Sequence, residues 1–170
     1  MDDRYTPVAK MMQDVFKADV QEFRGEVTLI IKPEYLIEVL KNLKLLFEYR
    51  MLVNLTAVDY WPQEAPRFHM IYHLRNIQEK SIISIRVPLD GNAPHIHTVE
   101  RVFPNANWFE REVYDLFGIH FDGHSDMRRI VMPYEWVGHP LRKDYPLGYE
   151  EVQFTFNFDE IDLKKPYAKD

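Results

Sequence analysis

Two stretches of alternating apolar and polar residues, joined by a turn-like link, constrain the fold of this chain most. Residues 67–74 place Phe68, Met70 and Tyr72 on one face, and residues 81–87 alternate in the same way. A period of two predicts strands that are buried on one face. Because the link between them is short, we expect these strands to pair antiparallel.

The rest of the chain predicts helices and further strands around this pair. We expect helices at residues 6–16, 33–50, 94–103 and 108–118. We expect further strands at residues 25–31 and 51–60, which are rich in β-forming side chains. The predicted fold class is α+β: a mainly antiparallel sheet of about four strands packed with helices, plus an extended C-terminal segment.

The domain organisation follows from length and from the last residues. A chain of 170 residues is expected to form one domain, which we assign to residues 1–146. Residues 147–170 form a tail in which Phe154 and Phe156 belong to an alternating run, as a half-buried strand would also show. We prefer a tail that lies on a partner subunit, because an unpaired line of phenylalanines promotes aggregation.

Composition excludes several classes of function. The net charge of −6 argues against a nucleic-acid-binding protein, which needs a basic face. The absence of cysteine excludes thiolate-ligated iron–sulfur clusters, disulfides and cysteine nucleophiles. No apolar run approaches the roughly 20 residues that span a bilayer, so any membrane link is expected to come through partners. The acidic N-terminus is no secretory signal.

Residues 108–146 combine ionic side chains with aromatic rings, Gly and Pro more densely than any other stretch. At their start we expect a helix whose apolar face holds Phe109, Val113, Leu116 and Phe117. Asn107 can cap this helix, and Gly118 can supply the left-handed residue past its end. The polar helix face can simply be solvated, with Arg111 and Asp115 as a surface pair. Charges interleaved with rings favour a protein–protein interface instead.

The same stretch offers one candidate metal site. His120, Asp122, His124 and Asp126 alternate, and imidazole with carboxylate is a workable ligand set for zinc or iron. This set leaves open a metal-dependent hydrolase, although the spacing lacks the helical frame of an HExxH site. We find no nucleophile elbow, phosphate loop or dinucleotide fingerprint, and hence no independent catalytic constellation.

The spaced motifs of this stretch resemble the NuoC family, the thirty-kilodalton subunit of respiratory complex I. The residues that carry the resemblance are Glu110-Arg111-Glu112, Asp115-Leu116-Phe117-Gly118, His124, Arg128-Arg129 and Trp136-Val137-Gly138-His139-Pro140-Leu141-Arg142-Lys143-Asp144-Tyr145-Pro146. Residues 55–60 and 103–108 also resemble the family. One departure is His97, where a second proline is expected.

The resemblance implies a structural subunit of a proton-pumping NADH:quinone oxidoreductase. Such a subunit belongs to the hydrophilic arm, at the cytoplasmic face of the inner membrane, and meets the membrane only through the complex. It packs against the large quinone-site subunit (NuoD-like), beside NuoB-like, NuoI-like and NuoG-like subunits. The resemblance implies no cofactor and no catalytic residue in this chain. NADH, FMN, Fe–S clusters and quinone are expected in the partner subunits.

We expect the interface with partners to use the ionic and aromatic signature residues together with the tail. The expected interface residues are Glu110, Arg111, Glu112, Asp115, His124, Arg128, Arg129, Trp136, Arg142, Lys143, Asp144, Phe154 and Phe156. Relatives of this family also serve ferredoxin-linked complexes, F420-linked complexes and membrane-bound hydrogenases, so the electron donor stays open. A general acidic adaptor unrelated to respiration is a further alternative.

Overall fold

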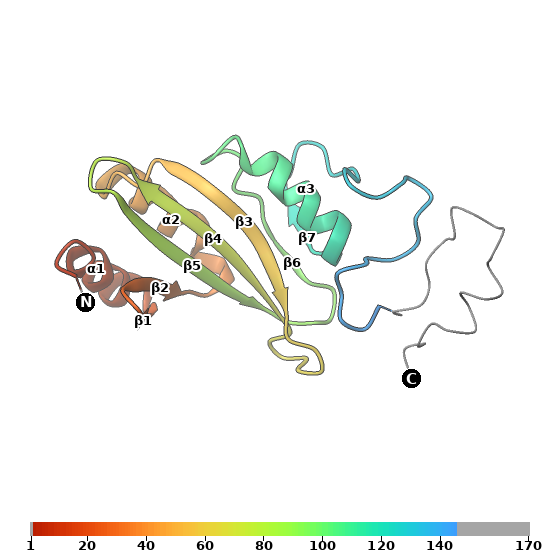
Figure 1. Ribbon diagram of the computed structural model, residues 1–170, viewed down its shortest axis with the longest axis horizontal. Helices are drawn as coiled ribbons and strands as arrows, with labels where there is room; N and C mark the ends of the chain where they lie inside the picture. The colour runs from red at the N-terminus through yellow and green to blue at the C-terminus, as the bar shows by residue number, and fades with distance from the viewer. Residues whose placement is uncertain (1, 146–170) are drawn as a thin grey trace.

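The computed structural model describes residues 2–145 and is built on a five-stranded sheet (Figure 1). The strands are β1 (Asp19–Phe23), β2 (Glu26–Ile30), β3 (Met51–Asp59), β4 (Phe68–Asn76) and β5 (Ser81–Leu89). Their order is β1-β2-β5-β4-β3, and every neighbouring pair is antiparallel except β2 with β5. The α+β class and the mainly antiparallel sheet are confirmed.

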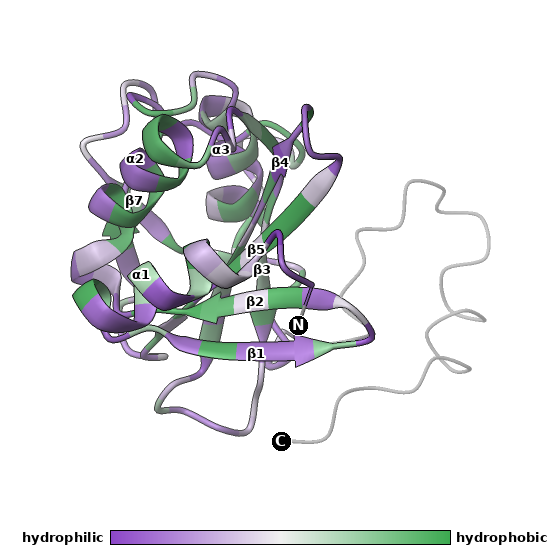
Figure 2. Cartoon of the chain, turned by 90° about the vertical axis from the view of Figure 1, so that its left-hand side faces the viewer, coloured by the Kyte–Doolittle hydropathy of each residue, from purple (hydrophilic) through white to green (hydrophobic). Residues whose placement is uncertain are grey.

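The helices of the described chain cover one side of this sheet. They are α1 (Thr6–Phe16), the short 3-10 helix η1 (Pro33–Tyr35), α2 (Leu36–Leu46) and α3 (Ala106–Phe117). Figure 2 shows α1, α2 and α3 on the same side of the strands. The predicted stripe of α2 is buried there, with Leu36, Val39, Leu40 and Leu43 each at 0% exposure. Within residues 2–145, no helix is long and apolar enough to cross a bilayer.

The alternation of β4 and β5 is confirmed by burial. Phe68, Met70 and Tyr72 are fully buried on the helix side, and Ile83 and Ile85 join them from β5. Residues of opposite parity point to the other side of β3, β4 and β5, which we call the open face. The hydrophobic effect therefore fixes which side of each strand meets the helices.

The predicted helix at residues 94–103 is wrong. His95–His97 is the short strand β6, which pairs parallel with β7 (His120–Asp122). The chain then makes a turn in which the N–H of Phe103 bonds to the carbonyl of Val99. Pairing with a distant strand satisfies backbone groups that a helix would otherwise bond locally.

Two further differences between the predicted and the observed elements lie in the N-terminal half of the chain. The helix predicted at residues 33–50 ends at Leu46, because Glu48 adopts a left-handed φ of 59° and Asn76 donates to the carbonyl of Phe47 at 3.1 Å. Strand β1 was not predicted, because its residues show no alternation of polarity. The tail at residues 147–170 lies outside the described residues.

Candidate partner interface

Helix α3 carries two fully buried carboxylates on the side that faces the domain. Glu110 and Asp115 are both 0% exposed, and they lie among the buried Val113 and Phe117. The hypothesis of a solvated polar helix face is therefore wrong for these two residues, whereas Glu112 is exposed. A buried carboxylate is stable only where several donors reach it, so the partners of each decide its role.

Asp115 binds the segment that follows the helix. Its Oδ2 accepts the backbone N–H groups of Ile130, Val131 and Met132 at 3.0, 2.8 and 2.8 Å. Its Oδ1 accepts Nη1 of Arg129 at 2.6 Å. Burial alone would raise the pKa of Asp115, but these three N–H groups and Arg129 outweigh it and lower the pKa. The ionised carboxylate thus holds three consecutive backbone groups, as an anion does in a nest.

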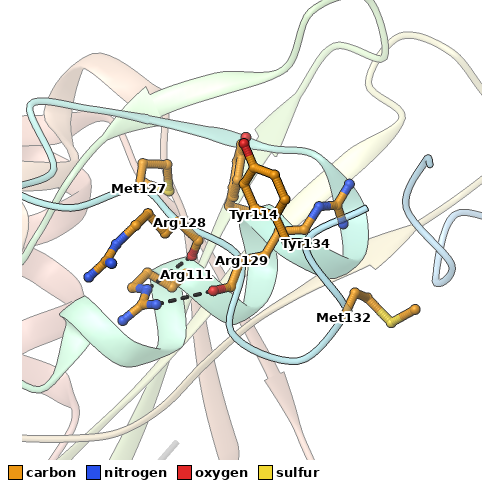
Figure 3. Close-up of a pocket in the computed structure, with 7 residues that line it drawn as sticks. All are labelled: Arg111, Tyr114, Met127, Arg128, Arg129, Met132 and Tyr134. Atoms are coloured by element: carbon orange, nitrogen blue, oxygen red, sulfur yellow. Dashed lines mark hydrogen bonds between the residues drawn. The ribbon is translucent and has the colours of Figure 1, made fainter. Parts of the chain in front are cut away.

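Arg111 holds the same segment from the neighbouring turn of α3. Its Nε and Nη2 donate to the carbonyls of Arg128 and Arg129 at 3.0 and 3.1 Å, as Figure 3 shows. The guanidinium also lies over the ring of Trp108, 5.4 Å from its centroid. The expected pair between Arg111 and Asp115 does not form, because each is committed to this segment.

The end of α3 is closed by residues from further along the chain. Gly118 is left-handed with a φ of 71°, as predicted, and Arg142 Nε donates to the carbonyl of Phe117 at 2.6 Å. The N–H of Leu141 donates to the carbonyl of Leu116 at 3.0 Å. These donors satisfy carbonyls that a helix end leaves unpaired. Residues 128–142 are therefore fixed at both ends, and we call them the clamped segment.

A buried ion cluster anchors the chain just beyond the clamped segment. Arg67 is only 5% exposed, and its Nη2 lies 2.9 Å from Asp59 Oδ2 and 2.7 Å from Asp144 Oδ1. The backbone N–H of Lys143 donates to Asp59 at 2.9 Å. Burial opposes the charge of Asp59, but Arg67 and two backbone N–H groups hold its pKa at about 2. The C-terminal end of the described chain is thus tied to the sheet.

The clamped segment turns apolar side chains outward. The exposed fractions are 41% for Ile130, 57% for Val131, 96% for Tyr134, 84% for Val137 and 50% for Leu141. We call these five residues the apolar rim. Large apolar side chains that a fixed backbone keeps exposed to solvent are typical of a binding surface. In a segment that was free to move, such side chains would turn inward and be buried.

A pocket of about 430 Å³ opens beside the apolar rim. Its lining residues are Arg111, Tyr114, Met127, Arg128, Arg129, Met132 and Tyr134. Figure 3 shows that they come from α3, from the clamped segment and, with Met127, from the residue just before that segment. Rings, methionines and guanidinium groups around one hollow are the components of interface hot spots.

Glu110 binds a different segment from Asp115, the turn that follows β6. Its carboxylate accepts the Thr98 hydroxyl at 2.5 Å and the N–H of Val99 at 2.7 Å. Its Oε2 also lies 3.8 Å from Nε2 of the buried His124. Burial, reinforced by the nearby Glu100 and opposed by the hydrogen bonds from Thr98 and Val99, raises the pKa of Glu110 to about 7. Glu110 therefore braces the turn after β6.

The candidate metal ligands do not converge. The ring of His124 is buried, with its Nδ1 accepting the N–H of Asp126 at 3.0 Å. Asp122 lies 2.8 Å from Nδ1 of His95, and Asp126 pairs with Arg128 at 2.6 Å. In residues 2–145, no group of three or more His, Cys, Asp or Glu side chains is placed to hold a metal ion. This geometry does not support the hydrolase hypothesis.

The remaining expected interface residues differ in how exposed they are. Arg128 and Lys143 are exposed, and Trp136 is half-buried with its backbone N–H bonded to the carbonyl of Pro133. Asp144 is also exposed, at 37% of its side chain, but it pairs with the buried Arg67. Phe154 and Phe156 lie outside the described residues.

Sequence reasoning missed Asp59 and Arg67. One signal could have found them: Asp59 follows Leu55 and Ala57 on the inward side of β3. A carboxylate on an inward position requires a cationic partner. The apolar rim was also missed, because single apolar residues between Pro and Gly are common at surfaces.

The sequence and the fold are matched by known proteins. The family model of the respiratory-chain NADH dehydrogenase 30 Kd subunit matches residues 29–151. The NADH-quinone oxidoreductase C subunit of Roseiflexus sp. (strain RS-1) is 46% identical over 151 residues, which are 88% of this chain and 86% of that protein. The corresponding C subunit from Geobacter metallireducens is 47% identical over 129 residues, 76% of this chain and 80% of that protein.

Solved structures agree. A trypsin-resistant fragment of Nqo5 has a TM-score of 0.66 at 28% identity, covering 72% of this chain and 98% of that chain. The structure of an archaeal membrane-bound sulfane sulfur reductase contains a chain with a TM-score of 0.66 at 21% identity, which shows the fold alone.

These findings define a subunit of a respiratory oxidoreductase complex. The chain belongs to the family of the respiratory-chain NADH dehydrogenase 30 Kd subunit, which includes the C subunits of NADH-quinone oxidoreductases. The family resemblance in residues 108–146 is confirmed. Other subunits of such a complex are the partners that membership implies.

Proposed function

We propose that this chain is a structural subunit of the hydrophilic arm of a proton-pumping NADH:quinone oxidoreductase. In this role it packs against the large quinone-site subunit, and the apolar rim and its pocket form the contact. The observation that carries the proposal is the Asp115 clamp, which fixes Ile130, Val131 and Met132 by hydrogen bonds of 2.8–3.0 Å. A surface that is already ordered loses less conformational entropy when it binds.

The structure supports two different roles among the expected interface residues, one for the buried and one for the exposed side chains. Glu110 and Asp115 act inside the chain, where they brace the turn after β6 and the clamped segment. Arg128, which pairs with Asp126, and Glu112 are both exposed, and in this proposal they meet a partner surface. The buried carboxylates thus determine the shape of the contact, and the exposed residues determine its partner.

The redox chemistry of the complex belongs, in this proposal, to the partner subunits. NADH, FMN, Fe–S clusters and quinone bind in neighbouring chains, among them NuoD-like, NuoB-like, NuoI-like and NuoG-like subunits. The lack of any cysteine thiolate in this sequence supports that assignment. The chain has no catalytic residue of its own and meets the cytoplasmic face of the membrane only through the complex.

The tail at residues 147–170 extends this contact. We assign Phe154 and Phe156 to the surface of the partner subunit, where alternate apolar side chains can be buried. The ion cluster of Arg67, Asp59 and Asp144 supports this role, because it fixes the point from which the tail departs.

The test is a purification of the assembled complex through a tag on this subunit, in mild detergent. Val137→Asp places a charge in the rim, where the side chain is 84% exposed. We expect the large subunit to be lost from the purified material, with the urea midpoint of the chain unchanged. Leu45→Asp is the matched control, because Leu45 is 70% exposed on the far side, on α2. Equal recovery of the large subunit with both variants would refute the proposed contact.

A further inference from the structure

On β3, β4 and β5 the open face carries basic side chains and no acidic ones, whereas the neighbouring β1 and β2 place Asp19 and Glu26 on the same side of the sheet. Its outward positions on β3, β4 and β5 include His69, His73, Arg75 and Arg86, and none of these outward positions holds Asp or Glu. The helices lie on the opposite side (Figure 2). The chain as a whole is acidic, with a net charge of −6, so the excess of positive charge on these three strands is a local feature of this face.

A preorganised cluster lies on this face, at one end of the paired strands. Nε of Arg86 donates to Nδ1 of His69 at 2.7 Å, and its Nη2 donates to the hydroxyl of Tyr60. The guanidinium lies 5.1 Å from the centroid of the Tyr60 ring, which in turn contacts the His69 ring edge-on at 4.8 Å. Each of the three side chains therefore fixes the orientation of the other two.

The hydrogen bonds of the cluster determine what it can bind. A guanidinium only donates, so Nδ1 of His69 must accept, and the ring proton is carried by Nε2. Burial and the charge of Arg86 lower the pKa of His69, which agrees with a neutral ring. Within residues 2–145, Nε2–H of His69 and Nη1 of Arg86 remain as donors, and the matching ligand is a negatively charged hydrogen-bond acceptor.

Exposed apolar side chains lie on the same face: Val58 is directly opposite His69, whereas Val53 and Ile82 lie further along the strands. Val53, Val58 and Ile82 are 40%, 37% and 46% exposed on the open face. A free anion would gain nothing from them, whereas a protein segment with acidic and apolar residues would cover both features. Nucleic acid is disfavoured by the net charge of the chain.

We propose that the open face is a second docking surface, separate from the apolar rim, which takes an acidic segment of a partner protein. A carboxylate of that segment is held by Arg86 and His69, and neighbouring apolar side chains cover Val58 and Ile82. Forked contacts between guanidinium and carboxylate give the contact its orientation. This surface does not depend on the clamped segment, so it can fail or hold independently of the proposed function.

The test is photo-crosslinking in the assembled complex. A photoreactive phenylalanine analogue replaces Thr56, which shares a row with Ile71 and Arg86 across the open face. We expect a crosslink to a segment of another subunit that contains Asp or Glu. Arg86→Glu should lower its yield about tenfold or more, since opposed like charges are costly at an interface. Lys41→Glu, the same charge change on exposed α2, should leave the yield unchanged.

A charge swap completes the experiment. Lysine in place of the crosslinked acidic residue should restore the yield in Arg86→Glu, and should lower it with wild-type Arg86. If Arg86→Glu does not fold, as judged by its urea midpoint, Arg86→Gln takes its place with a smaller expected loss. The proposal is overturned by a crosslink to residues 147–170 of the same chain, to lipid or to a segment without acidic residues. It is also overturned by no crosslink, or by an unchanged yield in the Arg86 variant.

Discussion

The Oδ2 atom of Asp115 accepts a hydrogen bond from the backbone N–H of Met132 at 2.8 Å, across 17 residues of sequence. Asp115 lies inside the domain, whereas the residues that follow Met132 lie at the surface. The bond therefore transmits the position of a buried helix to an exposed segment. In this way the domain core determines the shape of the surface that we assign to the partner contact.

Asp115→Asn is expected to release the clamped segment. The amide keeps the size of the side chain but removes the charge that pairs with Arg129, and breaking a buried ion pair costs about 3–5 kcal/mol. We expect trypsin to cleave faster after Arg129 in the folded protein, and the complex to retain less of the subunit. Asp126→Asn is the control, because its pair with Arg128 is exposed to solvent and contributes little to stability. Equal cleavage rates in both variants would contradict the clamp.

Arg128→Ala tests the exposed part of the interface. The side chain is 76% exposed and bonds within the chain only to Asp126 among the described residues. We expect near-normal folding of the isolated chain and poor retention in the complex, because in the proposed contact a buried carboxylate of the partner would lose its cation. Recovery of the subunit from detergent-solubilised membranes measures this. Assembly equal to wild type would remove Arg128 from the contact.

Glu110→Gln is expected to change how stability depends on pH. In the folded chain the pKa of Glu110 is raised to about 7, above the value of about 4.3 for an unfolded chain. The folded state therefore prefers the protonated acid, so this contribution to stability is full below about pH 4 and is lost as the pH rises to about 7. The neutral amide cannot ionise. Relative to the variant, wild type should lose up to about 3 kcal/mol across this window.

Urea unfolding from pH 4 to pH 8 measures that difference. Glu100 and His124 face Glu110, so the measured difference includes the change in their interactions with its carboxylate. Glu112→Gln is the control for the loss of a carboxylate from the same helix, because Glu112 is exposed. A curve for Glu110→Gln that is parallel to wild type would show that burial does not perturb this carboxyl.

Gly118→Ala and Gly25→Ala separate backbone strain from steric fit. Both glycines have positive φ, 71° and 84°, so alanine costs about 1–2 kcal/mol at either. A Cβ at Gly25 meets nothing within 4 Å, whereas at Gly118 it would lie 2.5 Å from Cδ2 of His139. Gly118→Ala should therefore destabilise the chain more, by displacing the clamped segment. Equal urea midpoints would mean that His139 moves aside without cost.

The sequence predicted the sheet and helices where a periodic pattern decides the structure. The alternation in β4 and β5, the stripe of α2 and the left-handed Gly118 were all visible, because each depends on residues close in the chain. The prediction failed at β6. There, the pairing partner is β7, which lies far along the chain, and no local pattern reveals it.

The same limit applied to the site. The sequence predicted residues 108–146 as the functional stretch and supported the family, since ionic and aromatic residues at fixed spacing are visible without coordinates. It did not separate Glu110 and Asp115, which are buried, from Glu112 and Arg128, which are exposed. A carboxylate can be buried only where backbone N–H groups and cations from distant segments converge on it, and only the tertiary structure brings those donors together.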